Sequence, residues 1–181
     1  MKANSLQELY MEQLRDLYDA EHQIIKALPK MISAANSEGL KQALTEHLDV
    51  TREQATRLEQ IFEDMGEKAK GERCKGMQGV LEEGNELVTG VKDSEVRDAA
   101  IIAAAQRVEH YEMAGYGTAR TFATILDEQE ASKLLQQTLD EEKEADQTLT
   151  DLAEKVNANA AGSGEREERE GRKPTRSRRA A

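Results

Sequence analysis

The segment VEHYEMAGYGTA, residues 108–119, lies in the middle of a long helical pattern that decides the fold. At about 100° per residue, apolar side chains recur along one stripe of this predicted helix. Those positions are Ile101, Ala105, Val108, Ala119, Ala123 and Leu126. Glu112 falls at the centre of the stripe and Glu109 at its edge, whereas His110 points away from it. A helix that buries two carboxylates requires partners for them elsewhere in the chain.

The same periodicity predicts three more long helices on either side of this segment. The four predicted helices cover residues 5–35, 37–65, 93–126 and 127–156. Ser5 with Glu8, and Asp127 with Glu130, have the spacing of a capping box, which indicates where the first and fourth helices begin. Ser37 is an N-cap candidate for the second helix.

The connections between these helices predict the topology. The first and last connections are very short, so the helices on either side of each are antiparallel neighbours. Residues 67–92 form a long middle connection in which we expect one short helix around residues 77–88. Two hairpins joined by a long crossover predict an all-α, ferritin-like four-helix bundle. We assign residues 1–157 to this domain and expect residues 158–181 to form a disordered basic tail, because apolar periodicity ends there.

The composition limits the expected partners and compartment. The net charge of −11 disfavours nucleic acid as a partner, apart from a weak contact through the basic tail. No apolar run approaches the length that crosses a membrane. The single cysteine, Cys74, precludes an intrachain disulfide, which fits a cytoplasmic protein. Its basic neighbours Arg73 and Lys75 leave a reactive thiol as a minor alternative.

Polar side chains interrupt the apolar stripe of every predicted helix. Glu21 lies at the centre of the first stripe, and Glu142, followed by Asp146, interrupts the fourth. On the second helix the inward polar residues are His47, Thr51 and Gln54. Glu21 lies about 15 residues before the first short connection, and Glu142 lies about 15 residues after the second. The polar positions of each hairpin therefore fall at mid-bundle, which predicts a single site.

These inward acids require neutralisation. Arg57 and Arg120 are at best marginal to the stripes, and no Lys or Arg is central to any of them. The acids therefore either keep their protons or bind cations. Carboxylates with an imidazole suit iron or manganese, so the sequence predicts a site for one or two such ions. Its candidate ligands are Glu21, His47, Gln54, Glu109, Glu112, Glu142 and Asp146.

Several segments of the chain resemble those of a known bacterial family. They are LYDAE (17–21), KALPKM (26–31), EHL (46–48), RDAAIIAAAQRVEHYEMAGYGT (97–118) and LLQQTLDEEKEAD (134–146). In order and spacing they resemble the YciE/YciF stress-protein family, over residues 5–156. The resemblance implies a ferritin-like fold related to rubrerythrins, a homodimer, and an association with osmotic and general stress.

The resemblance also implies a pattern of metal ligands. The glutamates that it implies on the first and third helices are matched by Glu21, Glu109 and Glu112. It further implies Glu-x-x-His on the second and fourth helices, and there the chain departs. Val50 stands where an acid is expected, Gln54 stands where some relatives carry His, and Asp146 follows Glu142 with no histidine. These departures imply one ion, or two ions of unequal affinity.

Three functions follow as hypotheses. The first is a metal-binding stress protein that oxidises Fe(II) or reduces peroxide at the carboxylate site. The alternative is a non-enzymatic, dimeric interaction protein in which the metal site is vestigial. A storage cage is a third hypothesis, for which the sequence offers no cage contacts. No catalytic residue is assigned from the sequence.

Overall fold

The structure is a computed structural model that describes the backbone of residues 3–171 and the side chains of residues 3–162. It contains five helices and, within the described residues, no strand. They are α1 (Leu6–Ala34), α2 (Glu38–Asp64), α3 (Lys75–Gly90), α4 (Ser94–Ile125) and α5 (Gln129–Gly171). No helix in this part of the chain combines the length and apolar character needed to cross a bilayer.

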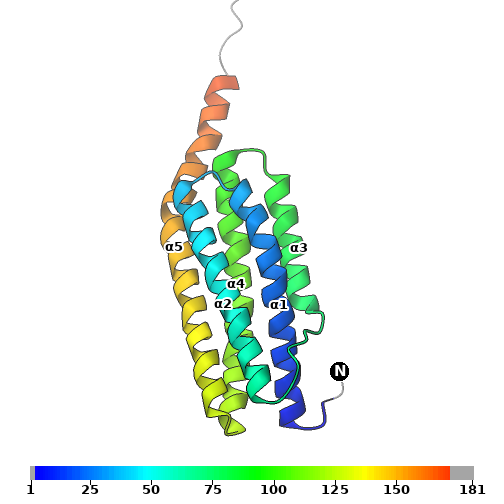
Figure 1. The fold of residues 1–181 in the computed structure, drawn as a ribbon. Coiled ribbons are helices and arrows are strands. Elements are labelled where there is room, and N and C mark those ends of the chain that lie inside the picture. The colour runs from blue at the N-terminus through cyan, green and yellow to red at the C-terminus, as the bar shows by residue number, and fades with distance from the viewer. Residues whose placement is uncertain (1–2, 172–181) are drawn as a thin grey trace, which may run out of the picture.

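The four long helices form two antiparallel hairpins (Figure 1). α1 pairs with α2 and α4 pairs with α5, while α1 also packs against α4 and α2 against α5. The short helix α3 runs along the outside of the bundle within the crossover and packs against α4 and α1. This arrangement confirms the predicted all-α, ferritin-like fold with its long crossover.

Local hydrogen bonds explain where most helices begin and end. The Ser5 hydroxyl accepts from the Glu8 backbone N–H at 3.1 Å, and the Ser37 hydroxyl caps α2. Asp93 caps α4 by accepting from two backbone N–H groups. After α2 the chain turns through Gly66 at φ 70°, a left-handed conformation that glycine adopts without steric cost. These caps agree with the predicted helix starts.

The predicted capping box at the start of the fourth helix is wrong. Asp127 has a φ of 63° and closes α4, because the N–H of Glu128 bonds to the carbonyl of Ala123 at 2.9 Å. This is the bonding pattern of a helix C-terminus, so α5 begins only at Gln129. Asp127 and Glu130 have the residue types and the spacing of a capping box, but the left-handed backbone of Asp127 forms the turn that ends α4.

The last helix extends past the residue at which apolar periodicity ends. α5 continues to Gly171 and projects beyond the other helices (Figure 1), so the first part of the expected 158–181 tail is helical. Residues 158–171 include three Gly, but Ala, Glu and Arg, which are good helix formers, make up most of the rest, so a helix already nucleated by packing can propagate through the segment. Residues 172–181, on which the rest of that prediction falls, lie outside the described residues.

The crossover is fastened to α1 at its junction with α3. The backbone N–H of Cys74 donates to Asp19 at 2.8 Å, and Gln23 donates to the Cys74 carbonyl at 3.0 Å. The thiol itself is buried, 3.1 Å from a carboxylate oxygen of Asp16 and 3.0 Å from the hydroxyl of Tyr111. The crossover therefore holds α3 in a fixed place over α1 and α4.

The core consists of two apolar clusters separated by a polar layer. One cluster includes Ile24, Leu44, Met77, Ile101 and Leu149. The other includes Tyr10, Leu14, Phe62, Tyr116 and Leu135. The residues of the polar layer are buried despite their chemistry, and they come from α1, α2, α4 and α5.

Candidate metal centre

Four side chains meet in this polar layer. His47 of α2, Glu109 and Glu112 of α4 and Glu142 of α5 each offer a donor atom, and these atoms all lie within 4.8 Å of one another. The three glutamates are at most 2% exposed, and the His47 side chain is 10% exposed. Helical geometry explains the pair on α4, since residues three apart lie on the same face one turn from each other.

Most donor atoms of this cluster lack a hydrogen-bond partner among the described residues, although Nε2 of His47 lies 3.5 Å from Oε1 of Glu109. They include Nε2 of His47, both carboxylate oxygens of Glu112, and one oxygen each of Glu109 and Glu142. A buried polar atom without a hydrogen bond costs roughly 1–3 kcal/mol, so a concentration of such atoms requires an explanation. A cation coordinated by these atoms would satisfy them together.

Glu21 and Gln54 lie next to the four-residue cluster. Glu21 is fully buried on α1 and accepts a hydrogen bond from the Tyr116 hydroxyl. Gln54 is fully buried on α2, and its amide donates to the Glu142 carboxylate. The structure therefore places both predicted residues at the centre, with Gln54 engaged as a hydrogen-bond donor.

Asp146 lies at the edge of the site. Its side chain is 23% exposed and lies 3.4 Å from Nε2 of His110. Gln106 also donates to it at 3.1 Å. Asp146 is therefore already paired on the outer side of the bundle, and the structure does not bring it into the cluster around Glu142.

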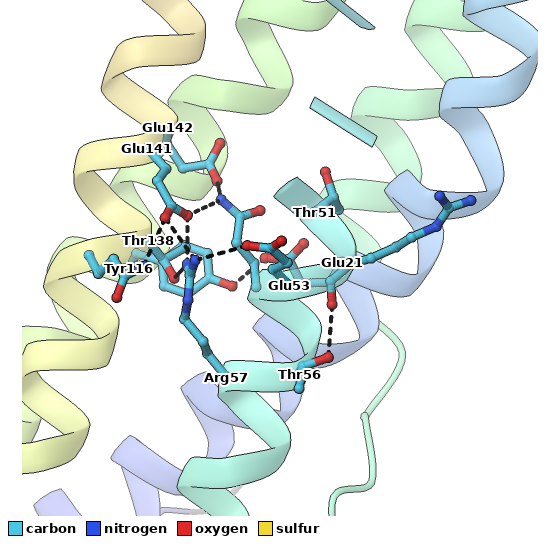
Figure 2. A network of polar contacts seen from close by, with 12 residues as sticks. Glu21, Thr51, Glu53, Thr56, Arg57, Tyr116, Thr138, Glu141 and Glu142 are labelled. Carbon is cyan, nitrogen blue, oxygen red and sulfur yellow. Dashed lines mark hydrogen bonds and ion pairs between the residues drawn. The ribbon is translucent and has the colours of Figure 1, made fainter. Parts of the chain in front are cut away.

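Arg57 and Glu141 form an ion pair beside the centre. Arg57 was expected to be marginal to the inward stripes, and Glu141 was not among the predicted site residues. The guanidinium of Arg57 on α2 approaches both oxygens of Glu141 on α5, at 2.5 and 2.7 Å (Figure 2). Arg57 also donates to the Thr138 hydroxyl at 3.1 Å. The nearest guanidinium is thus engaged by Glu141, and Glu142 faces the buried centre without it. No pattern within one helix signals this pair, because it depends on how α2 and α5 are aligned.

Burial dominates the electrostatics of the centre. It raises the pKa of Glu21, Glu109 and Glu112 well above the ordinary value, and the nearby Glu142 carboxylate raises each further. Burial also lowers the pKa of His47. Without a cation, burial therefore favours the protonated form of these glutamates and the neutral form of the imidazole, whose lone pair is then available to a metal.

An acidic groove connects the centre to the surface between α2 and α5. The groove has a volume of about 270 Å³, and its lining includes Glu46, Glu141 and Glu144 at the outside with His47 and Glu109 at the inside. Acidic walls raise the local concentration of cations. The groove is therefore suited to admit a metal ion to the cluster.

Oxygen and imidazole donors of this kind fit iron or manganese, and their lack of partners supports that fit. The arrangement, one cluster shared by the helices of a two-hairpin bundle, is also the one used by carboxylate-bridged metal sites.

The comparisons with known proteins agree with this architecture. The family model described as a domain of unknown function, DUF892, matches residues 5–161. The chain belongs to the DUF892 family. Protein YciF of Escherichia coli K12, a relative of this DUF892 chain, is 45% identical over 154 residues, which are 84% of this chain and 93% of YciF.

Solved structures of related proteins have the same fold as this chain. The crystal structure of the E. coli stress protein YciF superposes with a TM-score of 0.83 at 43% identity, covering 86% of this chain and 99% of that one. YcfI from Rhodopseudomonas palustris gives 0.80 at 43% identity, covering 81% and 94%. A protein from Xanthomonas campestris superposes with a TM-score of 0.68 at 21% identity, covering 91% of this chain and 99% of that one. At this identity the likeness supports only the fold. The predicted YciE/YciF resemblance is confirmed.

Proposed function

We propose that this protein is a metal-binding stress-response protein whose cluster of His47, Glu109, Glu112 and Glu142 holds iron or manganese. The observation that carries the proposal is the convergence of four largely buried donors within 4.8 Å, most of whose donor atoms make no hydrogen bond in the described part of the chain. The stress role rests on the likeness to YciF, which is described as a stress protein.

The surrounding residues have separate tasks in this proposal. Glu21 extends the carboxylate set toward α1 and would be the additional ligand for a second, weaker ion. Gln54 and Tyr116 orient Glu142 and Glu21 through hydrogen bonds, as outer partners of metal ligands commonly do. Asp146 serves the centre only through its charge, which reaches Glu109.

The chemistry follows from the metal that is bound. If iron were bound, oxidation of two Fe(II) to two Fe(III) would supply the two electrons that, with two protons, convert hydrogen peroxide to two waters or dioxygen to hydrogen peroxide. The carboxyls of Glu109 and Glu112 release their protons when a cation replaces them, which provides protons inside the apolar core. The protein's contribution is to hold the donors together and to exclude bulk water from them.

Metal content per chain tests this proposal. Full-length protein is loaded anaerobically with Fe(II) or Mn(II), freed of excess metal and analysed, beside Glu112→Gln and the exposed control Glu154→Gln. We expect one or two ions in wild type and in Glu154→Gln, and a marked loss in Glu112→Gln. Absence of bound metal in the wild type, or equal content in all three proteins, would overturn the proposal.

A non-enzymatic role is the second candidate, favoured by the second helix. Val50 and Gln54 provide no acid or imidazole there, and Gln54 already bonds to Glu142. In this alternative the glutamates stay protonated and the bundle surface binds a partner. A stress phenotype that survives Glu112→Gln and Glu142→Gln would favour it.

The homodimer and the cytoplasmic location implied at the sequence level form part of the proposal. The dimer is supported by the resemblance to the YciE/YciF family, and the location by the single buried cysteine. A mass measurement in solution distinguishes a dimer from a monomer and from a cage.

A further inference from the structure

A small apolar pocket shares Leu44, His47 and Glu109 with the acidic groove, but its other walls come from different helix faces. It is lined by residues of α1, α2, α3 and α4 and has a volume of about 40 Å³. Its walls include Ile24, Leu44, Val80, Leu81 and Ile101. Among its described lining residues, only His47 and Glu109 carry ionisable side chains, and both belong to the metal cluster.

The chemistry of the walls decides what can occupy this pocket. A charged solute would lose its hydration along the apolar walls and would find polar partners only at His47 and Glu109. Hydrogen peroxide would leave most of its donors and acceptors unsatisfied for the same reason. Apolar cavities in proteins tend to remain dry and to bind small apolar guests, including xenon. The volume exceeds the roughly 10–15 Å³ that one water requires, so a diatomic molecule fits.

The inner end of the pocket is where such a guest would be used. The His47 side chain is only 10% exposed, and its buried Nε2 atom has no hydrogen-bond partner. The acidic groove reaches the same two residues from the α2 and α5 side. Cations and uncharged molecules therefore have chemically different approaches to one centre.

We infer that this pocket binds a small, uncharged, apolar molecule of the size of dioxygen beside His47 and Glu109. The inference rests on the proposed function in one respect, because it selects dioxygen over peroxide as the electron acceptor. Binding of an apolar guest does not itself require a metal.

Gly84 of α3 supplies a way to close the pocket. A Cβ atom placed at Gly84 would lie 3.0 Å from the Cβ of Ala104 across the α3–α4 contact. Gly79 lies on the same helix, and a Cβ atom there would meet nothing within 4 Å. Gly84→Val and Gly79→Val therefore make a matched pair that changes helix propensity equally and the pocket unequally.

Xenon is the probe for the first experiment, on metal-free, full-length protein. We expect xenon-dependent methyl chemical shifts at Ile24, Val80, Leu81 and Ile101 in wild type and Gly79→Val. They should disappear in Gly84→Val, and Leu81→Ala should strengthen them by enlarging the pocket. Leu81→Ala keeps the test decisive if Gly84→Val does not fold. Absence of these shifts in the wild type would overturn the inference, whatever the metal analysis shows.

The second experiment uses Fe(II)-loaded protein. Gly84→Val should slow dioxygen consumption and leave peroxide consumption close to that of Gly79→Val. Equal dioxygen rates in wild type and both variants would overturn the pocket as the route. If wild-type protein binds no iron, the proposed function fails, while the xenon result still decides whether the pocket takes an apolar guest.

Discussion

Arg57 and Glu141 approach each other through two hydrogen bonds, with Nη2 of Arg57 2.7 Å from Oε1 of Glu141. The pair joins α2 to α5 beside a group of buried acids, and its Arg57 side chain is 13% exposed. Burial is the largest single influence on Glu141 and opposes its ionisation, but the hydrogen bonds from Arg57, Gln137 and Gln54 and the charge of Arg57 together lower the pKa of that carboxyl. Among the described residues, Arg57 is therefore the only arginine beside the buried acids, and Glu141 holds its guanidinium at the rim of the centre.

Replacing Arg57 with Met should destabilise the protein by about 1–2 kcal/mol, because Glu141 loses its partner while remaining partly buried. Urea unfolding measures the change. Arg52→Met is the control, since Arg52 pairs with Asp49 at the surface and such pairs contribute little. An equal effect of the two substitutions would contradict this view of the pair.

Glu112→Gln should stabilise the metal-free protein while weakening metal binding. Both Glu112 oxygens are buried without hydrogen-bond partners, and an amide of the same shape avoids the cost of holding a proton on that carboxyl at neutral pH, about 1–3 kcal/mol. Thermal unfolding with and without Mn(II) measures both effects. A variant that loses stability without metal would show that Glu112 has a structural partner in solution.

The contribution of the buried glutamates to stability should fall as the pH rises, which is opposite to the effect that causes ordinary acid denaturation. The pKa of Glu21, Glu109 and Glu112 is raised from 4.5, so each binds its proton more tightly in the folded state. Their contribution is fully present below pH 4.5 and is lost as the pH rises above it toward the raised values.

The difference in unfolding free energy between wild type and Glu112→Gln isolates this contribution from the other carboxyls. It should grow in favour of the variant as the pH rises. Saturating Mn(II) should reverse the trend, because the cation competes with the protons. A difference independent of pH would mean that Glu112 ionises normally.

Cys74 should react slowly with thiol reagents in the folded protein, contrary to the minor expectation from its basic neighbours. Burial raises the pKa of its thiol, and Asp16 and Tyr111 enclose the sulfur. Labelling with a maleimide should become fast only in urea. Rapid labelling in buffer would show that the junction between the crossover and α3 opens readily.

Local signals in the sequence predict the helices well and the contacts between them less well. Ser5 and Ser37 cap their helices as expected, because a cap needs only neighbouring backbone N–H groups, and Asp93 caps α4 where that helix was expected to begin. Asp127 has the same local signature but ends a helix, and only its backbone conformation distinguishes the two roles.

The same limit applies to the centre. Periodicity brings Glu109, Glu112 and Glu142 inward, but it does not separate them from Asp146, which lies at the rim and contacts His110 and Gln106. Alignment between helices, which a single sequence does not specify, decided the pairing of Arg57 with Glu141.

The two hairpins contribute unequally to the four candidate ligands. Glu109, Glu112 and Glu142 belong to α4 and α5, and His47 alone comes from the α1–α2 hairpin. An ion held by all four would act as a non-covalent cross-link whose single bond to the first hairpin is the imidazole. His47 would then set how strongly metal slows the separation of the hairpins, so the centre would govern the lifetime of the folded bundle as well as its chemistry.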